Sequence, residues 1–248
     1  MKIIILGGDG FIGWPLSLDL SKEGHEICIV DNFKRRKIDD ELDVSSLTPI
    51  KSLDTRISTW KLLTNQNIQS ENIDIDKDYL KLQNLLQDFQ PDVIFHLAEY
   101  KSAPYSMRSA YHKIETVGHN INAANVILSS IIEANIDTHL IHIGTMGVYG
   151  YSSVENTYIP EGYIDVDINY ESGFKEKRNI LYPFNPGSIY HLSKSLDNLI
   201  FQFYAKNDNL QITDLHQGIV WGCQTSLSMM HEDLINRFDY DGDYGTVL

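Results

Sequence analysis

The first thirteen residues, Met1-Lys-Ile-Ile-Ile-Leu-Gly-Gly-Asp-Gly-Phe-Ile-Gly13, decide the fold. A short apolar run leads directly into three spaced glycines, Gly7, Gly10 and Gly13, and then into an apolar-periodic segment that carries Leu16, Leu18 and Leu20. This order predicts a strand, a tight turn and a helix. In such a turn one glycine permits the sharp bend, one lets the backbone approach a pyrophosphate, and one lets the helix pack on the strand.

The predicted turn is a candidate phosphate site. Phosphates would lie on the unpaired N–H groups at the start of the helix, where the helix dipole favours negative charge, with Phe11 and Ile12 in the turn itself. Spaced glycines alone are weak evidence for a nucleotide. Here a strand precedes them, a helix follows, and an acidic residue lies downstream, and this context favours dinucleotide binding.

That acidic residue is Asp31, at the end of a second apolar run, Glu26 to Val30. A carboxylate at this point can accept hydrogen bonds from the adenosine ribose hydroxyls, and Asn32 follows it. Arg35 and Arg36 could instead bind the 2′-phosphate of NADP. Because the carboxylate would repel that phosphate, the sequence favours NAD.

Apolar runs alternate with helical patterns along most of the chain. Strands are expected at 3–6, 26–30, just before Asp74-Ile75, and at 93–98, 139–144 and 211–216, and helices at 79–89, 109–134 and 188–204. This alternation predicts an α/β fold, a Rossmann-type doubly wound parallel sheet with helices on both faces. Its ligand edge would carry Asp74 and Ile75 near the adenine, and Ala98 and Glu99 further along.

The alternation breaks over a polar stretch at about 37–67. It could be a surface insertion with a helix or two, or a loop that reaches over the cofactor or substrate, and the residues do not decide between these readings. We assign residues 1–220 to a dinucleotide-binding domain that includes this insertion.

Composition excludes several classes of protein. The chain has 248 residues and a net charge of −14, which argues against a nucleic-acid or anionic membrane surface. No apolar run is long enough to insert into a membrane, and no signal peptide is evident. Cys28 and Cys223 lack metal-binding spacing, so we expect a reduced, cytoplasmic protein without a metal site. His96, inside an apolar strand, is expected to be a core histidine.

Tyr190 and Lys194 are the candidate catalytic pair, because one helical turn separates them and both side chains share a face. A phenol has an ordinary pKa of about 10, which a neighbouring ammonium and the nicotinamide cation would lower. Tyr190 could then take a proton from a sugar hydroxyl while hydride leaves the adjacent carbon. Thr145, just past the fifth strand, could bind the same substrate oxygen. Without the glycine turn a structural role for Tyr190 and Lys194 would be favoured, and without that pair Thr145 would be an ordinary turn residue.

Together these motifs resemble the extended short-chain dehydrogenase/reductase family of sugar-nucleotide epimerases and dehydratases. Within it, strings along the whole chain resemble the branch that makes UDP-sulfoquinovose. They are Gly7-Gly-Asp-Gly10, Gly13-Trp14, Val30-Asp-Asn32, Arg35-Arg36, Ser46-Leu-Thr-Pro-Ile50, Arg56-Ile-Ser58, Trp60, Ser102-Ala-Pro-Tyr-Ser-Met107, Gly144-Thr-Met-Gly147, Tyr190-His-Leu-Ser-Lys194, Met230-His231-Glu232 and Asn236-Arg-Phe-Asp-Tyr-Asp241.

The resemblance implies an NAD-dependent conversion of UDP-glucose and sulfite, or a sulfite donor, into UDP-sulfoquinovose, a precursor for sulfolipid. The sugar would be oxidised at C4′, lose water, add sulfite at C6′ and be reduced again. Tyr190 would act on the C4′ hydroxyl, Lys194 would tune it and hold the nicotinamide ribose, Thr145 would bind the C4′ oxygen, and His191 would transfer a proton or hold sulfite. Lys101, Met146 and Gln217 would join Thr145 in contacting substrate, and a homodimer is implied.

Some positions depart from the family pattern. Lys101 stands where arginine is expected, and His119 and Asn122 replace an asparagine and a glycine. Residues 221–248 would be only the beginning of a small C-terminal substrate region, because the family continues well beyond Asp241. Two other functions therefore stay open: a UDP-sugar 4-epimerase and a non-catalytic NAD-binding fragment.

Overall fold

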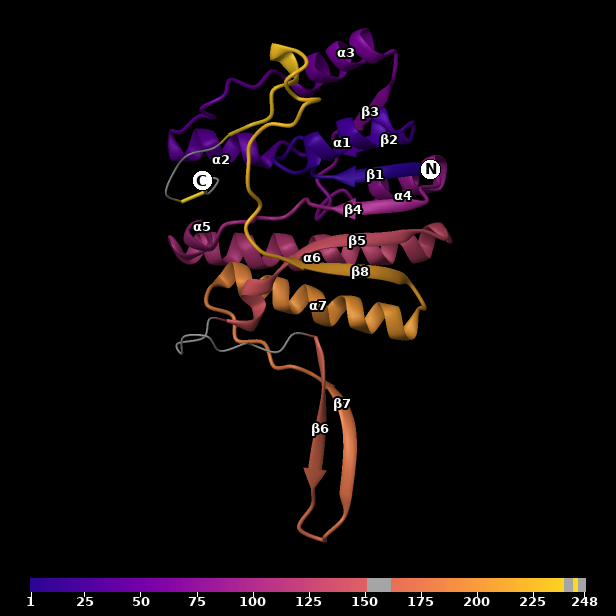
Figure 1. Cartoon of the computed structure of the whole chain (residues 1–248), viewed down its shortest axis with the longest axis vertical. Coiled ribbons are helices and arrows are strands. Elements are labelled where there is room, and N and C mark those ends of the chain that lie inside the picture. Colours follow the sequence, from indigo (N-terminus) through magenta and orange to yellow (C-terminus); the bar gives the residue numbers. More distant parts are fainter. Residues whose placement is uncertain (151–161, 239–242, 245–248) are drawn as a thin grey trace.

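The apolar runs form a six-stranded parallel sheet with the order β3-β2-β1-β4-β5-β8 in the computed structural model, which describes residues 1–150, 162–238 and 243–244. The crossover between β1 and β4 divides the sheet into two halves, which is the doubly wound arrangement (Figure 1). The predicted fold class is confirmed. The strands are β1 Lys2–Leu6, β2 Glu26–Val30, β3 Ile68–Glu71, β4 Val93–His96, β5 His139–Thr145 and β8 Gln211–Gln217.

Helices cover both faces of this sheet because alternate strand residues point to opposite sides. Ile4 and Leu6 of β1 pack in one core with α4, α6 and α7, whereas Ile3 and Ile5 pack in another with α1 and α3. The helices are α1 Gly13–Lys22, α2 Lys34–Leu42, α3 Leu53–Thr64, α4 Tyr79–Phe89, α5 Ala103–Met107, α6 Ala110–Ala134 and α7 Ile189–Asn207, with short 3-10 turns η1 Met146–Tyr149 and η2 Glu232–Leu234.

The polar insertion contains α2 and α3. Leu53 and Trp60 of α3 are buried and join the core on the α1 side of the sheet. The Trp60 indole N–H donates to Ser21 Oγ of α1 at 2.9 Å. The insertion therefore forms helices, as in the first of the two readings, and they pack into the domain next to the glycine turn.

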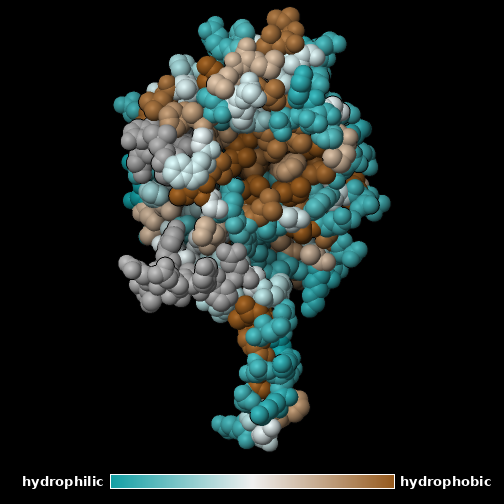
Figure 2. Space-filling model, in the orientation of Figure 1, coloured by the Kyte–Doolittle hydropathy of each residue, from teal (hydrophilic) through white to brown (hydrophobic). Residues whose placement is uncertain are grey.

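A second, two-stranded sheet was not predicted. β6 Tyr163–Asn169 and β7 Lys175–Leu181 form an antiparallel hairpin that projects away from the main body (Figure 1). The alternation of Ile164, Val166 and Ile168 with polar residues, followed by a glycine at position 173, was the signal available in the sequence. Figure 2 shows apolar residues exposed along this hairpin among hydrophilic ones.

The described part of the chain has no helix long and apolar enough to cross a membrane. Of the strings quoted above, residues 239–241 lie outside the described residues.

Candidate active site and cofactor cavity

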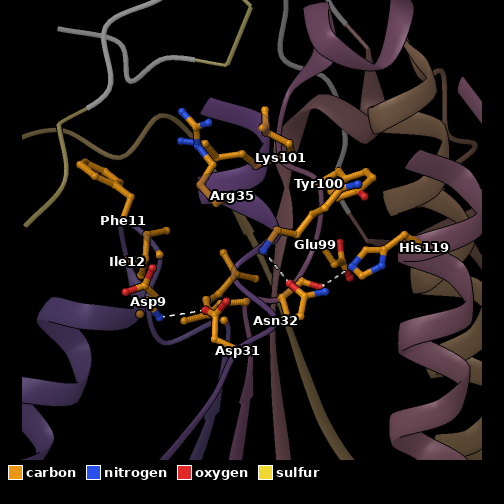
Figure 3. Close-up of a pocket in the computed structure, with 18 of the residues that line it drawn as sticks. Asp9, Phe11, Ile12, Asp31, Asn32, Arg35, Glu99, Tyr100, Lys101 and His119 are labelled. Carbon is orange, nitrogen blue, oxygen red and sulfur yellow. Dashed lines mark hydrogen bonds between the residues drawn. The ribbon is translucent and has the colours of Figure 1, made fainter. Parts of the chain in front are cut away.

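A cavity opens at the carboxyl ends of the parallel strands, beyond the adjacent strands β1 and β4 (Figure 3). Ligands bind at this switch point in doubly wound sheets. Its walls bring together most residues predicted to form the site. They are Gly7, Gly10, Phe11, Ile12, Gly13, Asp31, Asn32, Arg35, Ile75, Ala98, Glu99, Lys101, Tyr190, Lys194 and Gln217.

The glycine turn is closed on itself. A Cβ on Gly13 would lie 2.2 Å from the carbonyl oxygen of Gly7, so only glycine fits there. Gly7 has a φ of 86°, and a Cβ on it would lie 2.8 Å from the backbone of Leu97 at the end of β4. The first turn of α1 has neither a side-chain cap nor an acidic residue. The helix N-terminus is therefore suited to an anion from the ligand.

Asp31 lies at the end of β2 with its carboxylate held by the backbone. Its Oδ2 accepts the Asp9 N–H at 2.9 Å and its Oδ1 accepts the Phe33 N–H at 2.8 Å. Burial, with a smaller contribution from the neighbouring Asp9 carboxylate, raises the pKa of Asp31 to about 6. Each oxygen keeps a lone pair that can accept a ribose hydroxyl.

The two arginines after Asp31 have different surroundings. Arg35 lines the cavity and its guanidinium lies 4.4 Å from the ring centre of Tyr244. Arg36 turns away and forms a two-pronged ion pair with Asp9, with distances of 2.7 and 2.9 Å. Because this fork is already engaged, Arg36 is poorly placed to bind the 2′-phosphate that distinguishes NADP.

The adenine end of the cavity is apolar. Ile73 and Ile75 line it, whereas Asp74 lies outside the wall and accepts a hydrogen bond from Asn32 Nδ2 at 2.9 Å. His119, one of the departures from the family pattern, lines the cavity and faces two acceptors, Ala98 O at 3.2 Å and Asp76 Oδ1 at 3.1 Å. The Asp76 carboxylate helps to raise the pKa of His119 against the effect of burial.

Tyr190 lines the cavity, whereas Thr145 lies next to it and outside the described wall. Thr145 lies close enough to Tyr190 to influence its titration, and Thr145 Oγ1 accepts the Gly147 N–H at 3.1 Å. Burial dominates the titration of Tyr190 and raises its pKa, although the Lys194 charge and Thr145 act in the opposite direction. The expected lowering of this pKa is thus reversed in the protein alone, because desolvation of the phenolate outweighs the ammonium.

The Lys194 ammonium is fully engaged by the protein. It forms an ion pair with Glu99, lies 3.0 Å from His142 Nε2 and donates to Ile143 O at 2.9 Å. The prediction that Lys194 holds the nicotinamide ribose therefore requires this ammonium to exchange one of those partners. Burial works against this charge, but Glu99 raises the pKa of Lys194.

A buried polar network extends from Lys194 toward β8. Glu99 Oε1 lies 2.9 Å from His96 Nε2 and 3.0 Å from His142 Nε2, and His142 Nδ1 lies 2.7 Å from Asp214 Oδ1. His96 is fully buried, so its predicted place in the core is confirmed. The donor atoms of His96, Glu99 and His142 are close enough for a metal ion. The ammonium of Lys194 already supplies positive charge there and would repel a second cation.

Two other predicted residues, His191 and Met146, lie outside the described wall of the cavity, whereas Lys101 lies on it. His191 is buried with Nδ1 3.0 Å from Ser188 Oγ and its ring against Gly147, and it is absent from the described wall of the cavity. Met146 is half exposed on η1, also outside that wall. Lys101 lies on the wall with its ammonium 5.6 Å from the ring centre of Phe11.

Two site residues, His142 and Asp214, escaped the sequence analysis, and Asp9 and Arg56 appeared there only within strings that carry the resemblance, without a role. Asp9, Arg56, His142 and Asp214 are buried or nearly so and act through partners distant in the chain. For His142 and Asp214 the available signal was a polar or charged residue inside an apolar strand run.

The cavity fits an NAD cofactor on the evidence of the protein atoms. The glycine turn leaves no room for a Cβ, the start of α1 is uncapped, and Asp31 stands at the ribose position. The model of the NAD dependent epimerase/dehydratase family matches residues 3–240 of the sequence. The chain belongs to this family.

Individual relatives agree with that assignment. The chain is 39% identical over its whole length to "UDP-sulfoquinovose synthase, chloroplastic" of Spinacia oleracea, and 35% identical to UDP-sulfoquinovose synthase of Sulfolobus acidocaldarius. It spans 49% and 61% of the lengths of those proteins. In structure it resembles a UDP-glucose-4-epimerase from Stenotrophomonas maltophila with bound NAD, with a TM-score of 0.68 and 18% identity, over 97% of this chain and 57% of that one.

Proposed function

We propose that the chain is the cofactor-binding and catalytic part of an enzyme that converts UDP-glucose and sulfite, or a sulfite donor, into UDP-sulfoquinovose. The observation that carries this proposal is that Tyr190 and Lys194 both line an NAD-type cavity, with Thr145 next to Tyr190. The similarity to two proteins named as UDP-sulfoquinovose synthases supports the choice of product.

The chain's own residues would bind and orient the sugar and move its proton. NAD when bound would supply hydride removal at C4′ and its later return. Thr145 would hold the C4′ oxygen against the Tyr190 phenol, which must be deprotonated to accept the C4′ hydroxyl proton. Because burial raises the pKa of Tyr190, proton transfer would depend on the positive charge of Lys194 remaining close.

The residues after Thr145 bear on the type of reaction. Sugar 4,6-dehydratases usually place an acid–base pair directly after this threonine, whereas here Met146 and Gly147 follow it. The elimination of water would then need another proton donor. His191 stands next to Tyr190 in sequence, but its ring contacts Gly147, so a role with sulfite would require the η1 segment to move.

The decisive experiment is incubation of the purified protein with NAD, UDP-glucose and sulfite, followed by mass spectrometry of the nucleotide sugars. A sulfonated UDP-hexose supports the proposal. UDP-galactose without a sulfonated product would instead identify a 4-epimerase, whose catalytic tyrosine, lysine and threonine are the same. If neither forms and UDP-glucose does not bind, the chain is a non-catalytic NAD-binding fragment. Size-exclusion chromatography with light scattering tests the proposed homodimer.

A further inference from the structure

Asp9 places a second carboxylate inside the phosphate-binding turn. Its side chain is only 3% exposed, and its N–H donates to Asp31 Oδ2. The pyrophosphate of a dinucleotide is anionic, and like charges at short range oppose binding. Two adjacent carboxylates at this point therefore need compensation from the protein.

Two arginines provide that compensation. Arg36 of α2 holds both Asp9 oxygens with its Nε and Nη2, and Arg56 Nη1 of α3 lies 2.9 Å from Asp9 Oδ1. Arg36 also donates to Lys51 O at 2.8 Å. Charge-assisted, bidentate hydrogen bonds of this type fix geometry as well as charge.

Arg56 is unusual because its side chain is completely buried. Its guanidinium lies 4.0 Å from the ring centre of Trp14, and its Nε and Nη2 have no hydrogen-bond partner among the described residues. Burial lowers the pKa of Arg56 to about 10, which still leaves it charged at neutral pH. A buried arginine with a single ionic partner is a poor source of stability, so the pairing of Arg56 with Asp9 points to a role at the turn.

We propose that Asp9, Arg36 and Arg56 are positioning residues that clamp the glycine turn in its phosphate-binding conformation and thereby slow the release of NAD. This inference rests on NAD occupying the cavity. The clamp gives the insertion a function. Its helix α3 supplies Arg56, and the Lys51 carbonyl in the loop before α3 accepts a hydrogen bond from Arg36.

The clamp acts on the backbone that would contact the phosphates. Asp9 immediately precedes Gly10, Phe11 and Ile12, which line the cavity. For the turn to open, the Asp9 carboxylate must leave both arginines. A cofactor that takes a hydride and later returns it must remain bound between the two steps, and a slow opening of the turn would serve that need.

The test measures dissociation of NADH by stopped-flow fluorescence, with excess NAD as the displacing ligand. Asp9→Asn, Arg36→Ala and the double variant are compared with Lys37→Ala, an exposed position next to Arg36 on α2. We expect each single substitution to speed release about tenfold, as for the loss of a hydrogen bond to a charged group. The double variant should be no faster than the singles, and Lys37→Ala should match the wild type.

The double-mutant cycle separates the clamp from direct contact. Effects of Asp9→Asn and Arg36→Ala that multiply would mean that Arg36 touches the cofactor itself, and the proposal would be overturned. Unchanged rates in both variants would also overturn it. If Asp9→Asn does not fold, Arg36→Lys, which keeps the charge but loses the fork, should show faster release, and a wild-type rate there would refute the clamp. Failure of the wild type to bind NADH would instead refute the NAD-dependent function.

Discussion

Replacement of Gly7 by alanine should destabilise the protein more than replacement of Gly24, although both glycines have nearly the same backbone conformation. Their φ angles are 86° and 84°. A left-handed conformation costs a residue with a Cβ about 1–2 kcal/mol, and this term applies to both. A Cβ on Gly24 meets nothing within 4 Å, whereas one on Gly7 lies 2.8 Å from the Leu97 backbone.

The difference between the two losses of stability measures the steric cost of placing a Cβ on Gly7 against the Leu97 backbone at the end of β4. Overpacking against a rigid neighbour costs about 1–3 kcal/mol, so Gly7→Ala should lose about 2–5 kcal/mol and Gly24→Ala about 1–2 kcal/mol. Urea unfolding followed by far-ultraviolet circular dichroism gives both free energies of unfolding. Equal losses in the two variants would show that the turn relaxes freely and that close packing does not explain the glycine.

The other predictions concern the cavity and its titratable groups. Tyr190→Phe should abolish conversion of UDP-glucose while NAD affinity, measured by calorimetry, changes only a few-fold; surviving activity would contradict the proton-transfer role. Asp31→Ala should weaken NAD binding, and an unchanged affinity would remove Asp31 from the ribose site. The pKa of Asp31 is raised from 3.8 to about 6 on folding, so its contribution to stability is present below pH 3.8 and is lost as pH rises through about 6. The unfolding free energy of wild type relative to Asp31→Asn should therefore fall over this range, and a flat difference would contradict the raised value. Lys194→Met leaves the Glu99 carboxylate buried without its ammonium, and should cost about 3–5 kcal/mol in unfolding free energy, against little change for the exposed Lys77→Met.

The sheet and its ligand edge were predictable because they follow from local patterns. The runs at Ile3 and Glu26 are apolar and end in a glycine or an acid, and short-range periodicity is enough to recognise them. The same reasoning placed Tyr190 and Lys194 on one helical face, since only one turn separates them.

What escaped prediction depends on pairs distant in the chain. No local pattern tells Arg36 to turn away from the cofactor and toward Asp9, because the second arginine on Asp9 comes from α3. Likewise, the pKa of Tyr190 is decided by burial beneath several elements and by the pairing of Lys194 with Glu99. The periodicity of the sequence predicts neither the burial of a side chain beneath several elements nor the pairing of residues distant in the chain.

The projecting hairpin has a mechanical consequence for the catalytic helix. The Tyr163 hydroxyl at its base donates to Gln202 of α7 at 2.8 Å, and β7 continues through residues 182–188 into the start of that helix. The short link is itself fastened to the body by the Asn185 N–H, which donates to Val148 O at 2.8 Å. A force applied to the hairpin tip, for example by a bound molecule, would be transmitted to α7 at both of these points. The first turn of α7 carries Tyr190.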